Sequence, residues 1–176
     1  MKNTIAVFGS ARVKTNSPQY RLGIEIGHLL AGLGFNILCG GFGGIMAAVC
    51  RGAKEKGATT AGIGLTCFKK NPNPYLDSYH CVDSLGERLE YFQTKSSIIL
   101  GMPGGIGTLT EVLYFWDSKK AGSGTEHPIL LYGKGWENLI ACLENNFIIG
   151  TAHLALPKIF LNTGTLEEYL KNKIPA

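Results

Sequence analysis

The apolar run Ser97-Ile98-Ile99-Leu100 leads into the turn Pro103-Gly104-Gly105-Ile106-Gly107-Thr108. A short apolar run bounded by turn residues is typical of a strand that is buried on both faces of a sheet. The residues after the turn, to about Lys120, form the next expected helix. The segment therefore predicts a strand, a glycine-rich turn and a helix in direct succession, the repeating unit of an α/β fold.

The same unit occurs twice before this segment. Ile5-Ala6-Val7-Phe8 ends at Gly9-Ser10, and Phe35-Asn36-Ile37-Leu38-Cys39 ends in Gly40-Gly41-Phe42-Gly43-Gly44. We expect strands at residues 5–8, 35–39, 59–65, 97–100, 128–132 and 158–161. We expect helices at residues 19–33, 45–56, 85–95 and 136–147. Two more helices are expected, one directly after the turn at 103–108 and one that begins at residue 165. Residues 66–78 are expected to form a loop. The alternation predicts the α/β class, as one Rossmann-like three-layer αβα domain over residues 1–176 with a mostly parallel sheet.

Composition narrows the classes of function. The chain of 176 residues has 45% hydrophobic and 17% charged residues, which is ordinary for a globular protein. Its net charge of +4 is spread without a basic stripe, so nucleic-acid binding is not predicted. Five cysteines without C-x-x-C spacing predict free thiols, no metal site and a cytoplasmic location. No apolar run reaches the roughly 20 residues that span a bilayer, so a membrane partner is not expected either.

The three glycine turns predict a binding site for an anion. Ligands of open parallel sheets bind beyond the carboxyl ends of the strands, where all three turns are expected to meet. Glycine allows an anion to approach the backbone, and the N–H groups and dipole of a helix N-terminus favour negative charge. We therefore expect a site for phosphate or a phosphosugar. The sequence contains neither G-x-x-x-x-G-K-[ST] nor G-x-G-x-x-G, which argues against P-loop ATPases and ordinary NAD enzymes.

Two charged residues near these turns have competing interpretations. Thr108-x-x-Glu111 matches a capping box, in which both side chains satisfy N–H groups of the helix. A carboxylate at Glu111 would also lie within reach of the hydroxyls of a bound sugar. Arg88 is expected either as a solvated charge on its helix, paired with Glu87 or Glu90, or as part of the site.

The nine residues Pro103 to Glu111 match the motif P-G-G-x-G-T-x-x-E, and the chain thereby resembles the LOG family of cytokinin riboside 5′-monophosphate phosphoribohydrolases. The opening V-F-G-S, the turn from Leu38 to Met46 and the position of Arg88 extend the resemblance over most of the chain. It implies hydrolysis of the N-glycosidic bond of a nucleoside 5′-monophosphate to free base and ribose 5-phosphate, without a metal or organic cofactor. Arg88 and Glu111 would be the catalytic pair. The residues implied for phosphate and nucleotide binding are Gly9, Ser10, Gly40, Gly41, Gly43, Gly44, Met46, Gly104, Gly105, Gly107 and Thr108.

Two departures from the LOG pattern lead to an alternative. Leu89 follows Arg88 where the family usually has lysine, and the second turn ends in Ile45-Met46-Ala47 rather than in a fuller glycine run with Met-Gly. Both features resemble a sister branch that includes molybdenum-cofactor carrier proteins, which bind rather than cleave. The alternative function is therefore a nucleotide or molybdenum-cofactor binding or carrier protein. In either case we expect a phosphorylated small molecule as ligand.

A homodimer is also expected. The segment Val112-Leu113-Tyr114-Phe115-Trp116 carries more apolar surface than one face of a sheet readily covers. Members of the family that resemble this chain are dimers.

Overall fold

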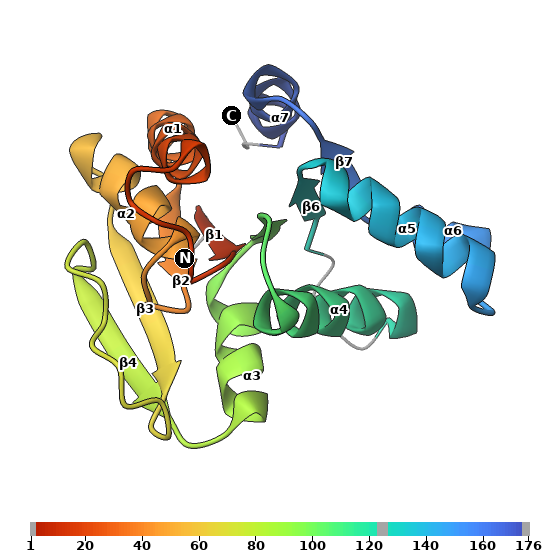
Figure 1. Ribbon diagram of the computed structural model, residues 1–176, viewed down its shortest axis with the longest axis horizontal. Coiled ribbons are helices and arrows are strands. Elements are labelled where there is room, and N and C mark those ends of the chain that lie inside the picture. The colour runs from red at the N-terminus through yellow and green to blue at the C-terminus, as the bar shows by residue number, and fades with distance from the viewer. Residues whose placement is uncertain (1–2, 123–126, 174–176) are drawn as a thin grey trace.

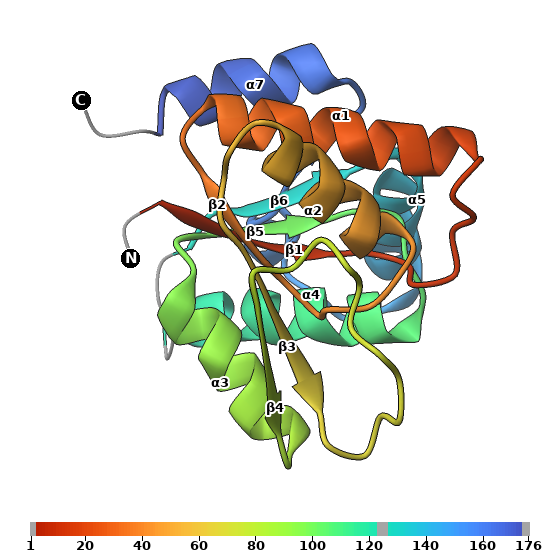
Figure 2. The same ribbon diagram turned by 90° about the vertical axis from the view of Figure 1, so that its left-hand side faces the viewer.

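The computed structural model describes residues 3–122 and 127–173, which form one seven-stranded sheet covered by helices on both faces (Figures 1 and 2). The strands are β1 (Thr4–Phe8), β2 (Asn36–Cys39), β3 (Thr60–Leu65), β4 (Ser78–Val82), β5 (Ile98–Gly101), β6 (Ile129–Tyr132) and β7 (Lys158–Phe160). The helices are α1 (Pro18–Gly32), α2 (Ile45–Glu55), α3 (Leu85–Lys95), α4 (Ile106–Ala121), α5 (Lys134–Asn146), α6 (Thr151–Leu154) and α7 (Thr163–Lys171).

All six strand pairings are parallel, and the strands lie in the order β4-β3-β2-β1-β5-β6-β7. The chain builds the sheet outward from β1 on one side and then returns to its other side with β5. The topological switch point therefore lies between β1 and β5, where open parallel sheets bind their ligands. Register keeps the carboxyl ends of the central strands level, since Val7 is opposite both Cys39 and Leu100.

Side chains on the strands alternate between two buried layers. Ile5 and Val7 point into the layer that contains α1, α2 and α7, whereas Ala6 and Phe8 point into the layer with α3, α4, α5 and α6. Figure 2 shows the first group of helices above the sheet, with α3 and α4 below it. The α/β class and the three-layer arrangement expected from the sequence are thus confirmed.

Helices α1 and α2 approach one another closely because glycine and alanine line their contact. A Cβ added at Gly27 would lie 2.2 Å from the carbonyl oxygen of Val49, and one at Gly52 would lie 2.1 Å from that of Ile24. A Cβ at Gly23 would lie 2.6 Å from the Cβ of Ala48. No larger side chain can occupy these positions without moving one helix away from the other.

Two elements differ from expectation. Residues 78–82 form β4, although we expected a loop to residue 78 and no strand after it. This edge strand is largely exposed, so it lacks the apolar run that marks the buried strands. The short helix α6 was also not expected. The other boundaries lie within about two residues of those expected, as usual for such assignments. None of the helices in the described ranges is long and apolar enough to cross a membrane.

Candidate functional site

A cleft of about 620 Å³ opens at the switch point of the sheet. The turn after β1, the turn after β2 and the turn after β5 all contribute to its lining. Of the residues expected to bind phosphate or nucleotide, the cleft is lined by Gly9, Ser10, Met46, Gly105, Gly107 and Thr108. The expected catalytic pair, Arg88 and Glu111, lines it as well.

The turn between β5 and α4 presents open backbone to the cleft. Gly105 is the N-cap of α4, and its position has no side-chain cap. A Cβ added at Gly105 or Gly107 would meet nothing within 4 Å, so the space beside the first turn of α4 is empty. An uncapped helix N-terminus with glycine beside it is suited to an anion.

The turn after β1 connects the other two turns through backbone hydrogen bonds. The N–H of Ser10 donates to the carbonyl of Pro103 at 3.1 Å, and the N–H of Ile45 donates to the carbonyl of Ser10 at 2.9 Å. Gly9 is required here because an added Cβ would lie 2.7 Å from a methyl carbon of Ile45. The three turns consequently form one connected wall of the cleft.

Gly40, Gly41 and Gly44 of the turn between β2 and α2 have a packing role instead, because an added Cβ at each would meet a neighbouring atom closely. Gly40, Gly41, Gly43 and Gly44 lie next to the cleft but do not line it, and the same is true of Gly104. A Cβ at Gly40 would lie 2.5 Å from an Nη atom of Arg88, so this glycine leaves room for the guanidinium group. From this turn and the start of α2, Phe42 and Met46 reach the cleft.

Arg88 and Glu111 form a buried ion pair. Nη1 of Arg88 donates to Oε1 of Glu111 at 2.7 Å, and Nε donates to the carbonyl oxygen of Ile63 at 2.9 Å. Each residue is 7% exposed, and the guanidinium carbon lies 5.2 Å from the centre of the Phe92 ring. The pairing joins α3 to α4 across the lining of the cleft.

This geometry contradicts two interpretations of the sequence, namely Arg88 as a solvated charge and Glu111 as a capping residue. Arg88 is buried rather than solvated, and its partner is Glu111 rather than Glu87 or Glu90. The interpretation of Glu111 as a capping residue is wrong, because α4 begins after Gly105 and Glu111 lies more than one turn inside the helix. The capping box of this region belongs to α3, where Ser84 and Glu87 exchange hydrogen bonds.

Burial raises the pKa of Glu111 to about 7, although the charge and hydrogen bond of Arg88 act in the opposite direction. Desolvation disfavours the ionised carboxylate, and one ion pair compensates for it only in part. The group therefore changes its charge near neutral pH. A carboxyl group with such a raised pKa in a cleft is a candidate for chemistry.

The cleft has an apolar wall that, apart from Met46, was not anticipated from the sequence. This wall consists of Phe42, Met46, Leu65, Phe68, Leu85 and Ile106. The rings of Phe42 and Phe68 meet edge to face with their centres 5.7 Å apart. Phe42 could have been found from its place inside a glycine turn, whereas nothing in the loop pattern marks Phe68. Arg12, two residues after Ser10, also lines the cleft and was not anticipated.

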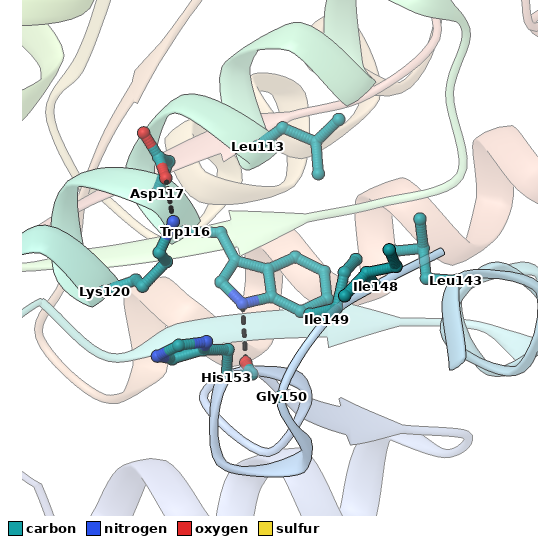
Figure 3. Close-up of a pocket in the computed structure, with 9 residues that line it drawn as sticks. All are labelled: Leu113, Trp116, Asp117, Lys120, Leu143, Ile148, Ile149, Gly150 and His153. Carbon is teal, nitrogen blue, oxygen red and sulfur yellow. Dashed lines mark hydrogen bonds and ion pairs between the residues drawn. The ribbon is translucent and has the colours of Figure 1, made fainter. Parts of the chain in front are cut away.

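Two further cavities lie outside this cleft, and the second of them is lined in part by Pro103 and Gly104. One of about 440 Å³ is bounded by α4, the end of α5 and α6, and its lining residues are drawn in Figure 3. The Trp116 ring lies in its wall, and the indole N–H donates to the carbonyl of His153 at 2.7 Å. A second, of about 410 Å³, lies between the N-terminal turns of α4 and α5. Within the described residues, no three His, Cys, Asp or Glu side chains are grouped as a metal site.

The sequence profile of the SLOG cluster4 family matches residues 2–127, which include the three turns and the Arg88–Glu111 pair. This chain belongs to the SLOG cluster4 family. The resemblance to LOG proteins expected from the sequence is thereby confirmed. The cytokinin riboside 5′-monophosphate phosphoribohydrolase of Mycobacterium tuberculosis is 28% identical over 131 residues, which cover 73% of this SLOG chain and 69% of that relative.

Solved structures with the same fold cover nearly the whole chain. The molybdenum cofactor binding protein of Rippkaea orientalis matches this SLOG protein with a TM-score of 0.73 and 24% identity over 99% of both chains. The molybdenum cofactor carrier protein of Chlamydomonas reinhardtii matches with a TM-score of 0.71 and 22% identity over 98% of both chains. At these identities the similarity establishes the fold.

Proposed function

We propose that this protein hydrolyses the N-glycosidic bond of a nucleoside 5′-monophosphate, releasing the free base and ribose 5-phosphate. The observation that carries the proposal is the buried pair of Arg88 and Glu111 in the lining of a glycine-walled cleft. The curated phosphoribohydrolase relative supports the same class of reaction.

The cleft has two chemically different walls that match the two ends of a nucleotide. The 5′-phosphate would bind at the uncapped N-terminus of α4, beside Gly105 and Gly107. The base would lie against the apolar wall that contains Phe42 and Phe68. The ribose would then lie between these ends, within reach of Glu111.

In the proposed reaction the bond between C1′ and the base nitrogen breaks, and a water oxygen bonds to C1′. One proton of the water goes to the departing base. The transition state resembles an oxocarbenium ion, so positive charge develops on the ribose. The carboxylate of Glu111 would stabilise this charge or orient the water. Arg88 would hold Glu111 through the hydrogen bond between them and would orient the nucleotide.

The direct test is release of free base from AMP, followed by chromatography, with adenosine as the comparison. We expect release from AMP and much slower release from adenosine, because the phosphate supplies the binding energy that fixes the geometry. Calorimetry should likewise give much tighter binding of AMP than of adenosine. Equal affinity for the two would contradict the phosphate anchor.

Two observations favour a second candidate, a carrier that binds a phosphorylated cofactor without cleaving it. Proteins that bind the molybdenum cofactor match this fold over nearly their full length. Leu89, at the position where LOG proteins usually have lysine, is 5% exposed and packs into the core rather than reaching the cleft. A wild-type protein that binds AMP but releases no base would favour the carrier.

We also propose that the protein forms a homodimer. Of the segment that suggested it, Val112, Phe115 and Trp116 are buried inside the chain, while Leu113 remains exposed. The apolar surface continues across the cavity of Figure 3 to the exposed Ile148. Light scattering at micromolar concentration should give twice the mass of one chain, and a monomer alone would contradict the proposal.

A further inference from the structure

The charges that line the cleft do not balance. Among the described residues of the lining, Arg12, Arg88 and Glu111 are charged. Arg88 and Glu111 are paired at 2.7 Å, so their charges largely cancel. Arg12 is therefore the charged side chain of the described lining that has no oppositely charged partner.

The main chain of Arg12 is fixed although its side chain is exposed. Its backbone N–H donates to Oγ of Ser10 at 3.1 Å, and Ser10 is bonded through its own backbone to Pro103 and Ile45. Arg12 thus lies on the turn after β1, which connects the turn after β2 to the turn after β5. Within residues 3–122 and 127–173, its guanidinium group makes no hydrogen bond or ion pair.

Arg88 cannot replace Arg12 as the partner of a phosphate. One of its Nη atoms is bonded to Glu111, its Nε is bonded to the carbonyl of Ile63, and its guanidinium group packs over Phe92. Removing it from these contacts would leave a buried carboxylate without its partner, which is costly. The backbone N–H groups of α4 are neutral, so they alone cannot neutralise a phosphate dianion.

We propose that Arg12 holds the phosphate of the ligand, closing over the group that binds at the N-terminus of α4. Guanidinium presents parallel N–H donors that match two phosphate oxygens, and such charge-assisted pairs are stronger than neutral hydrogen bonds. Arg12 acts as a positioning residue and takes no part in bond breaking. The inference rests on the proposed class of ligand, a phosphorylated small molecule, and it applies whether the protein is a hydrolase or a carrier.

The test is calorimetry of AMP, ribose 5-phosphate and adenosine with wild type, Arg12→Ala, Arg12→Lys and Arg21→Ala. Arg12→Ala should weaken both phosphorylated ligands about 10-fold or more and leave adenosine unchanged, as expected for loss of a charge-assisted hydrogen bond. It should also make AMP binding less dependent on salt, because an ion pair is removed. Arg12→Lys should restore part of the affinity. Arg21→Ala removes the same charge from α1 outside the cleft, where Arg21 bonds the carbonyl of Asn16, and should behave as wild type.

Unchanged affinity of Arg12→Ala for AMP would overturn the proposal, and so would an equal loss for adenosine or a wild type that binds neither phosphorylated ligand. The readout does not depend on hydrolysis. A wild type that binds AMP without releasing base would contradict the hydrolase proposal. The proposal for Arg12 would still stand or fall with the affinity of Arg12→Ala for AMP. In an active enzyme, Arg12→Ala should raise KM with a smaller effect on kcat.

Discussion

The turn between β2 and α2 and the turn between β5 and α4 share the pattern Gly-Gly-x-Gly but use it for different purposes. In the first turn, Gly41 and Gly44 have φ values of +82° and +64°, which favour glycine. A Cβ at Gly44 would lie 2.2 Å from the carbonyl oxygen of Ser10. In the second turn, Gly105 and Gly107 are not among the described glycines with positive φ, and a Cβ on either would enter open space.

The first turn therefore needs Gly41 and Gly44 for its own folding, and the second has Gly105 and Gly107 where a ligand would approach, while its Gly104 packs against Thr108. The helices that follow the two turns also differ, because α4 has a charged residue in the cleft where α2 has a core residue. Counted from the first glycine of each turn, the position of Glu111 in α4 corresponds to Ala47 in α2, which is buried in the core. An identical sequence pattern thus does not identify a ligand site until the space around each glycine is known.

The largest effect should come from removing the carboxylate of Glu111, which lies in the helix after the second turn and has no counterpart after the first. We expect Glu111→Gln to lower kcat about 10²-fold or more, the scale of losing one group that stabilises a transition state. Affinity for AMP should change little, because ground-state binding depends on the phosphate. Steady-state kinetics and calorimetry measure the two effects.

The matched control is the same substitution at Glu87, whose carboxylate caps α3. Glutamine also serves in a capping box, so Glu87→Gln should retain turnover. If Glu111→Gln were as active as Glu87→Gln, Glu111 would have no part in the chemistry.

The next effect should fall on the stability of the first turn. Gly44→Ala should lower the free energy of unfolding by about 3 kcal/mol and Tm by roughly 6–12 °C, because the substitution adds both backbone strain and a contact with Ser10. Gly57→Ala is the control, since Gly57 has a φ of +81° but no atom within 4 Å of an added Cβ. Thermal unfolding of the two variants separates strain from contact. Equal Tm values would mean that the contact with Ser10 costs nothing.

A pH profile should reveal the raised pKa of Glu111. If the ionised carboxylate is the active form, kcat/KM should rise about tenfold between pH 6 and pH 8, because the pKa of Glu111 is raised to about 7. The profile of Glu111→Gln should lack this rise, which separates it from ionisation of the nucleotide phosphate. A wild-type rate that falls across the same range would indicate that the protonated form acts.

The smallest effect concerns the open space of the second turn. We expect Gly107→Ala to keep Tm or raise it slightly, because alanine favours a helix more than glycine does. Its Cβ would occupy the space beside the phosphate, so affinity for AMP should fall roughly 5- to 10-fold. Gly32→Ala in α1 also meets no atom within 4 Å and lies outside the cleft, so it should bind AMP as wild type does. Unchanged binding by Gly107→Ala would mean that the phosphate lies elsewhere.

Much of the fold could be predicted because its strands are apolar and its turns contain glycine. β4 was missed because an exposed edge strand such as Ser78–Val82 has no apolar run to mark it. The pairing of Arg88 with Glu111 could not be derived from local pattern, since these residues are 23 positions apart and meet only when α3 and α4 cover the same face. The family resemblance indicated the pair without giving its geometry. The role of each glycine depended on contacts between turns, which no local pattern contains.

The close contact of α1 with α2 has a consequence for how this fold can diversify. Both helices follow turns of the cleft, and Gly27 and Gly52 leave no room for a larger side chain between them. Mutations that reshape the cleft from this side must therefore disturb the core as well. In the loop between β3 and β4, the exposed residues 66–72, which include Phe68, are free of that restriction, whereas the buried Asn73 bonds the carbonyls of Gly41 and Phe42. New ligand preferences should accordingly arise by exchange of residues 66–72, while the phosphate end of the cleft is inherited unchanged.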